Sequence, residues 1–280
     1  MTPIQKRIII NKLALTFSTI SAIVALTFLF WILGVLVMKG LLALNWNIFI
    51  YDGSPPSYAE SGLRHAFIGQ FILVGLSTLI GVPLGILAGT YLSEYGKNSA
   101  LANAIRDISD IMMSAPSIVI GAFVYAIVVM PMGHFSAWAG AIALAIIMIP
   151  IILRTTDDML RLVPETLREA AFALGAPKYK VIIGIVYRGA KAGILTGILL
   201  GIARVGGETA PLLFTSFNDN FFTTDLNEAM PSLTVTMFNY ATSPYDDWQQ
   251  LGWAAAFILF MFILTLNILG RFILLIGKRK

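Results

Sequence analysis

The chain of 280 residues contains no cysteine and few charged side chains. Without cysteine it can form no disulfide, no thiolate nucleophile and no cysteine-ligated metal site. Charged residues make up 12% of the chain, whereas a typical soluble domain contains about 25%. The net charge of +4 is also too small to indicate a nucleic-acid-binding surface. These shortages exclude several enzyme and binding classes and favour a membrane protein.

Apolar sequence is abundant, since 58% of the residues are hydrophobic. The first apolar run, 13–38, is longer than the roughly 7–15-residue core of a signal peptide, so we interpret it as a retained transmembrane helix. We predict an all-α integral membrane protein with a single transmembrane domain over residues 1–280. At about 1.5 Å per residue, six runs can cross a core of about 30 Å: 13–38, 66–92, 108–130, 137–154, 191–216 and 250–276.

The distribution of Lys and Arg predicts the orientation of these spans. With the N-terminus inside, 16 of the 19 basic residues fall in inner segments, and the positive-inside rule then places both termini in the cytosol. His65 and His134 are expected as interfacial side chains at the outer edge and not as metal ligands. The outer loop 217–249 carries five acidic residues and no Lys or Arg, which fits either the same rule or a docking surface.

The long inner loop, about 155–190, contains a predicted short helix. Pro164 suits its first turn, Gly175 is a natural stop and Pro177 prevents continuation. Such a helix fits a groove on another protein or packs on this protein's own helix ends. Its apolar positions recur at i, i+3, i+4 and i+7 and form one narrow face: Leu167, Ala170, Ala171 and Leu174.

This loop resembles the EAA loop of bacterial ABC-importer permeases. Glu169, Ala170, Ala171, Gly175 and Ile185 match the spacing of that motif, whereas Tyr187 and Arg188 stand where the family usually has Leu-Pro. The resemblance implies a type I importer permease fold of six transmembrane helices with a cytosolic coupling helix that inserts into a groove of an ATPase. It assigns the ATPase-coupling role to five residues: Glu169, Ala170, Ala171, Leu174 and Gly175.

Four longer segments resemble the PstA-type permease subunits of bacterial phosphate importers. They are "DISDIMMSAPSIVIGAFVYAIVV", "ILRTTDDMLRLVPETLREAAFALGAPK", "LTGILLGIARVGGETAPLLFT" and "SPYDDWQQLGWAAAF". The resemblance implies phosphate import through the bacterial inner membrane with a PstC-type sister permease, two copies of a PstB-type cytosolic ATPase and a periplasmic PstS-type phosphate-binding protein. Permeases for another oxyanion, sulfate or molybdate, and an ion-coupled secondary transporter remain the alternatives.

The energy source must lie outside this chain. The chain has no G-x-x-x-x-G-K-[ST] loop to cradle the phosphates of a nucleotide, and no G-x-S-x-G element. We therefore expect a transport subunit without catalysis of its own. It binds no cofactor or metal in this interpretation, while ATP and Mg²⁺ are used by the partner ATPase.

Two charged residues, Arg204 and Glu208, stand inside the fifth predicted span. Arg204 lies about 13 residues from the start of the span, near the bilayer midplane, where a charge costs at least about 2.5–3.5 kcal/mol. At about 100° per residue both continue a stripe formed by Gly193, Gly197 and Gly201, so we expect this face to point into the protein.

Three interpretations of this pair stay open. It is a structural ion pair, a proton- or ion-coupling site, or a contact for a translocating anion, because the planar Arg fork matches phosphate oxygens. In the third, Glu208 orients and partly neutralises Arg204. Two weaker candidates join the substrate pathway: Thr209, which could instead bond its own backbone, and Arg154, which could instead snorkel to the cytosolic edge.

Glycine and proline also pattern the spans. A second glycine stripe, Gly81, Gly85 and Gly89, predicts tight helix packing in the second span. Intramembrane prolines remove backbone hydrogen bonds and are expected either to kink their helices or to be accommodated: Pro83, Pro116, Pro150 and Pro211.

Overall fold

The computed structural model describes residues 3–56, 58, 60–96 and 99–277, and within these every regular element is helical. This confirms the all-α prediction. Three segments, labelled η, are π-helical. The elements are α1 (Pro3–Ala43), α2 (Asn47–Ile50), α3 (Arg64–Thr90), η1 (Tyr91–Gly96), α4 (Ala100–Ser114), α5 (Ser117–Val124), η2 (Tyr125–Val129), α6 (Met130–Met132), α7 (Ala137–Arg161), α8 (Glu165–Ala173), α9 (Lys178–Val181), η3 (Ile182–Val186), α10 (Tyr187–Gly206), α11 (Ala210–Thr215), α12 (Leu233–Ala241) and α13 (Asp246–Gly277).

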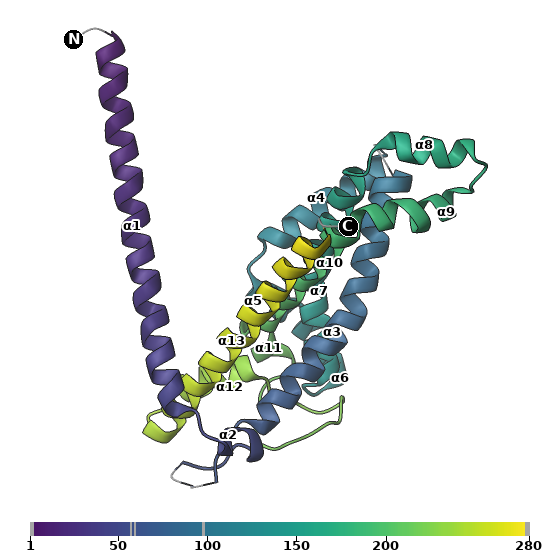
Figure 1. The fold of residues 1–280 in the computed structure, drawn as a ribbon. Coiled ribbons are helices and arrows are strands. Elements are labelled where there is room, and N and C mark those ends of the chain that lie inside the picture. Colours follow the sequence, from purple (N-terminus) through teal and green to yellow (C-terminus); the bar gives the residue numbers. More distant parts are fainter. Residues whose placement is uncertain (1–2, 57, 59, 97–98, 278–280) are drawn as a thin grey trace.

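The long helices agree with the predicted spans, with two exceptions. In the described residues, five helical segments are long and apolar enough to cross a membrane, and one bent pair brings the number to six. Figure 1 shows α3, α7, α10 and α13 side by side, while α1 stands apart and joins the rest near its end, where Gly40 is buried against Phe257 of α13. The start of α1, the end of α13 and α8 lie at the same end of the molecule (Figure 1).

The third predicted span, 108–130, is a bent pair of helices, broken at one of the prolines expected either to kink its helix or to be accommodated. Two helices, α4 and α5, meet there at an angle of 105°. The cause is Pro116, because a proline disfavours helical geometry in the residue before it. Ala115 accordingly adopts an extended conformation, with φ −67° and ψ 136°.

The fifth predicted span, 191–216, is also broken. It begins earlier, since α9, η3 and α10 run continuously from Lys178, and α10 ends at Gly206. The next helix, α11, starts at Ala210 with Pro211 in its first turn. Two adjacent glycines followed by an early proline favour ending one helix and starting another. Glu208 therefore lies in the break, and the helical wheel of α10 does not extend to it.

Helix α7 forms the centre of the bundle, and both glycine stripes pack on it. A side chain at Gly85 or Gly89 would meet Ile152 or the Leu153 carbonyl oxygen of α7 at 2.8 and 2.6 Å. The glycine stripe on α10 also packs on α7, where it faces Met159, Thr155 and Met148. This confirms tight packing for α3 and the inward direction of the glycine face of α10. Of the four prolines, Pro83 and Pro150 lie inside uninterrupted helices, whereas Pro116 and Pro211 lie at the breaks.

The outer loop 217–249 contains a helix that the sequence analysis missed. Helix α12 packs on α13 and α3, and all four of its side chains from Leu233 to Thr236 are buried. Ser232 caps it by accepting a hydrogen bond from the Val235 N–H at 3.3 Å. The placement of His65 at an interface was also wrong. Its side chain is buried, and Nδ1 accepts a hydrogen bond from the Gly53 N–H at 3.0 Å.

Candidate functional site

Arg204 and Glu208 form the ion pair that their spacing suggested, but the arginine side chain is exposed and the glutamate side chain is buried. Arg204 lies in the last turn of α10, and its Nη1 pairs with Oε1 of Glu208 in the break. The carboxylate side chain is 6% exposed, whereas the arginine side chain is 56% exposed on this chain. The prediction that both charges point into this chain holds for Glu208 and was wrong for Arg204. The exposed guanidinium can offer its other N–H groups to a ligand or a neighbouring subunit.

The break between α10 and α11 is held by buried hydrogen bonds from distant parts of the chain. Gln70 of α3 donates to the Gly206 carbonyl at 3.1 Å and accepts from the Leu233 N–H at 3.1 Å. The Thr234 hydroxyl donates to the Glu208 carbonyl at 2.9 Å. Helices α3 and α12 thus fix the backbone at the end of α10 and within the break, and with it the carboxylate that orients Arg204.

The two weaker candidates lie in different places. Thr209 follows Glu208 directly, is half-buried and does not cap α11 with its side chain. Arg154 lies on α7 and faces α4, where its Nη2 is 3.9 Å from Oδ2 of Asp110. Thr209 therefore stays beside the ion pair, whereas Arg154 belongs to a contact between α7 and α4.

The predicted coupling helix is present as α8. It ends with Gly175 at φ +80°, a left-handed conformation that favours glycine, and Pro177 caps the following α9. One part of its apolar stripe packs inside this chain, and the other part is exposed. Ala171 is buried within this chain, whereas Leu167 and Leu174 are 49% and 89% exposed, and Glu169 and Ala170 are also exposed.

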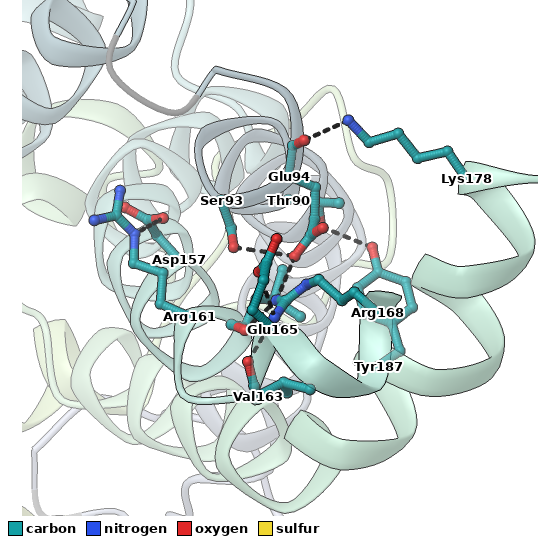
Figure 2. Close-up of polar contacts among 11 residues, drawn as sticks. Thr90, Ser93, Glu94, Asp157, Arg161, Val163, Glu165, Arg168, Lys178 and Tyr187 are labelled. Carbon is teal, nitrogen blue, oxygen red and sulfur yellow. Dashed lines mark hydrogen bonds and ion pairs between the residues drawn. The ribbon is translucent and has the colours of Figure 1, made fainter. Parts of the chain in front are cut away.

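A buried charged residue ties α8 to the bundle (Figure 2). The guanidinium of Arg168 donates to Glu94 Oε1 at 2.7 Å, to the Leu160 carbonyl at 2.8 Å and to the Val163 carbonyl at 2.5 Å. Lys178, on the other side of the Gly175 turn, donates to the Glu94 carbonyl at 2.6 Å. The segments before and after the Gly175 turn therefore both bind η1, which continues α3.

Two further contacts lie next to the Arg168–Glu94 pair, which forms the joint between α8 and the bundle. Asp157 of α7 is buried and accepts from Arg106 Nε at 3.0 Å and from Arg161 Nε at 2.8 Å. Tyr187 occupies a position where this loop departs from the family pattern, and its hydroxyl lies 2.7 Å from the Thr90 hydroxyl (Figure 2). The departure therefore forms a hydrogen bond between α10 and the end of α3.

Sequence reasoning did not single out five of the residues that hold these two regions together. Their partners lie far away in the sequence, and such pairs leave no periodic signal. An amide side chain in an apolar run is the one signal that could have drawn attention to Gln70, whereas Glu94 and Asp157 stand in polar stretches of sequence. The missed residues are Gln70, Glu94, Asp157, Arg168 and Thr234. Across the described residues, no group of three or more His, Asp or Glu side chains is arranged to hold a metal ion.

Comparison with known proteins gives one family and a consistent set of relatives. Residues 81–278 match the model of the family described as "Binding-protein-dependent transport system inner membrane component". The chain is 52% identical to the phosphate transport system permease protein PstA of Haemophilus influenzae over 261 residues, covering 93% of this chain and 92% of that protein. Identity to the protein of the same name from Pasteurella multocida is 51%, with 93% of both chains covered.

Solved structures agree at the level of the fold. The MetNI methionine ABC transporter in an inward-facing conformation contains a chain that matches with a TM-score of 0.59. The match covers 77% of this chain and 94% of that chain at 18% sequence identity. At this identity the likeness concerns the fold alone.

Proposed function

The chain belongs to the family of binding-protein-dependent transport system inner membrane components, and on that premise we propose that it is the membrane-spanning permease subunit of an ATP-driven importer for inorganic phosphate. The assignment of phosphate as the substrate rests on identity above 50% to phosphate permeases over more than 90% of the chain. The chain is a transport subunit, and a separate ATPase supplies the energy.

The partners follow from the same relatives and from the exposed surface of α8. A cytosolic ATPase binds the face of α8 formed by Leu167, Ala170 and Leu174. These three residues are exposed on this chain. The finer composition is a PstC-type sister permease, two copies of a PstB-type ATPase and a PstS-type binding protein on the opposite side. This arrangement places both termini in the cytosol, since the start of α1 and the end of α13 lie at the same end as α8 (Figure 1).

Arg204 is the residue that meets phosphate in this proposal. Its guanidinium is more than half exposed on the isolated chain, at the end of α10, and its partner Glu208 is held by the buried backbone contacts of the break. Phosphate is mostly dianionic near neutral pH, and an apolar pathway rejects it unless such a donor is present. Glu208 keeps the arginine oriented and partly neutralised, so that phosphate binds strongly enough to enter and weakly enough to leave.

The test is uptake of radiolabelled phosphate by proteoliposomes that contain the assembled complex. We expect accumulation that requires ATP and the binding protein and that excess sulfate or molybdate does not reduce. Equal competition by sulfate or molybdate would assign the chain to another oxyanion. Accumulation that follows an ion gradient without ATP would contradict an ATP-driven importer.

A further inference from the structure

Helix α8 is attached to the rest of the chain by few buried groups. Of its nine residues, Arg168 and Ala171 are buried. Ala171 contributes an apolar contact, which is non-directional and can slide. Arg168 is the charged side chain of α8 that the bundle encloses, and a guanidinium imposes a fixed direction on each hydrogen bond. A displacement of α8 is therefore transferred most directly through Arg168.

Three of the four acceptors of Arg168 lie on or directly beside two membrane-spanning helices, and the remaining one, Glu165 Oε2 at 3.4 Å, belongs to α8 itself. Two are the Leu160 and Val163 carbonyls, at and just after the C-terminal turn of α7, where a positive charge is favoured by the exposed carbonyl groups. The third is the Glu94 carboxylate of η1, which continues α3. Arg168 and Glu94 are each about as enclosed as the core, with side chains 8% exposed. One guanidinium thus joins α8 to α7 and α3 together.

Beyond this joint, close packing continues to the ion pair of Arg204. Helices α3 and α7 touch at Gly85 and Gly89, where no side chain fits between them. Helix α7 touches α10 on another side through Gly193 and Gly197. Close-packed interfaces of this kind move as units and do not deform continuously. Helix α10 ends in the turn that carries Arg204.

We propose that Arg168, paired with Glu94, is the positioning residue through which movement of α8 reaches α7 and α3 and, from α7, the end of α10. The inference rests on the proposed function, in which α8 receives the movement of an ATPase. It assigns to Arg168 a role that differs from docking, because its side chain is buried within this chain and faces away from the exposed stripe. Lys178 steadies the same joint from the far side of the Gly175 turn.

The experiment compares phosphate moved per ATP hydrolysed in proteoliposomes that contain the whole complex. The variants are Glu94→Gln, which keeps the size of the side chain, and Arg168→Met, which keeps most of its length. Arg161→Gln is the matched control, because Arg161 lies in the same pocket but pairs with Asp157 of its own helix. We expect the two joint variants to retain the ATPase and to hydrolyse ATP, while the ratio falls roughly tenfold. The control stays within roughly twofold of the wild type.

A reversible cross-link between positions 94 and 168 tests whether restoring the connection restores function. Because the chain has no cysteine, cysteines placed at positions 94 and 168 can be joined by a bifunctional thiol cross-linker and released by reduction. We expect the doubly substituted complex to regain most of its phosphate-per-ATP ratio when cross-linked and to lose it again on reduction. The wild-type complex treated with the same reagent controls for cysteines in the partner chains.

The outcomes separate the two proposals. A wild-type complex that moves no phosphate overturns the proposed function and this inference with it. Wild-type uptake together with an unchanged ratio in both joint variants overturns the inference alone. The inference alone is also overturned if the variants lose the ATPase from the complex and the cross-linked cysteine pair fails to restore the ratio, since Arg168 then only stabilises the fold.

Discussion

Two ion pairs of this chain, Arg168–Glu94 and Arg204–Glu208, differ in what surrounds the guanidinium. Around Arg168, two carbonyls and the carboxylates of Glu94 and Glu165 accept hydrogen bonds, and the side chain is 8% exposed. Arg204 pairs with a buried carboxylate, yet its own side chain is 56% exposed. A guanidinium whose donors are taken up inside the protein holds helices together, whereas one that faces outward keeps donors for something that arrives from outside.

The two pairs also differ in how far apart their members lie in the sequence. Four residues separate Arg204 from Glu208, so helical spacing alone predicts that pair. Arg168 and Glu94 lie 74 residues apart, and only the fold brings them together. Substitutions in both regions can establish whether the outward arginine works on phosphate and whether the contacts that support it act as described.

The largest effect is expected from Arg204→Gln. Glutamine removes the charge and the planar fork while it leaves the buried partners of the break in place. Loss of two charge-assisted hydrogen bonds to phosphate corresponds to a fall in uptake of roughly 1,000-fold. The measurement is labelled phosphate uptake by reconstituted complex, with subunit content determined in parallel. Preserved uptake in a fully assembled complex would show that Arg204 does not contact phosphate.

Charging the exposed stripe of α8 should separate the ATPase from this chain. Leu174 is the best position because it is 89% exposed. Ala171, which the sequence pattern places in the same stripe, is buried within this chain, so a charge there would also disturb its own loop. An unpaired carboxylate in an apolar groove should weaken ATPase binding roughly 100-fold in Leu174→Glu.

Co-purification of the ATPase measures this effect. Leu162→Glu is the matched control, because Leu162 is 73% exposed but lies before the start of α8. The ATPase should be retained by the control and lost from Leu174→Glu. Retention in both variants would argue that α8 is not the docking element.

Neutralising Glu208 should act differently from neutralising Arg204. In Glu208→Gln the arginine loses its counter-charge, so phosphate should be held more tightly and released more slowly. We expect turnover to fall roughly tenfold while the phosphate concentration for half-maximal uptake also falls. The initial rate of uptake over a range of phosphate concentrations measures both quantities. A rise in the half-maximal concentration would instead indicate that Glu208 supports binding.

Gln70 offers a smaller test of how the break is positioned. Gln70→Leu leaves the Gly206 carbonyl and the Leu233 N–H without their buried partner. Each unsatisfied buried group costs about 1–3 kcal/mol, part of which the loop can recover by shifting, so we expect uptake to fall roughly fivefold. Gln249→Leu is the control, because its side chain bonds a carbonyl only six residues away, in the outer segment. Equal uptake in both variants would show that the Gln70 hydrogen bonds, which hold the break between α10 and α11, are not needed for uptake.

Periodic and local signals in the sequence predicted a large part of this fold. The apolar runs indicated the long helices, and Pro164, Gly175 and Pro177 marked the boundaries of α8. These features depend on neighbours in the sequence. The glycine stripe on α10 also predicted the face that packs on α7.

The breaks and the buried polar contacts were harder to predict. Pro116 and Pro211 were visible as possible kinks, yet apolar composition on both sides made a continuous span the simpler interpretation. Whether Glu208 continued the glycine face depended on where α10 ended, which helical periodicity cannot decide. The Gln70 contacts join residues 136 and 163 positions apart, so only the three-dimensional packing reveals them.

The most direct measurement of the role of Arg204 is charge rescue at that position. Because the chain contains no cysteine, Arg204→Cys can be modified by a thiol reagent that adds either a positively charged or a neutral group of similar size. If the charge at position 204 meets phosphate, the unmodified variant should lose phosphate uptake, the positively charged adduct should restore a substantial part of it, and the neutral adduct should not. Equal recovery with both adducts, or full uptake by the unmodified variant, would contradict a contact between Arg204 and the translocated anion.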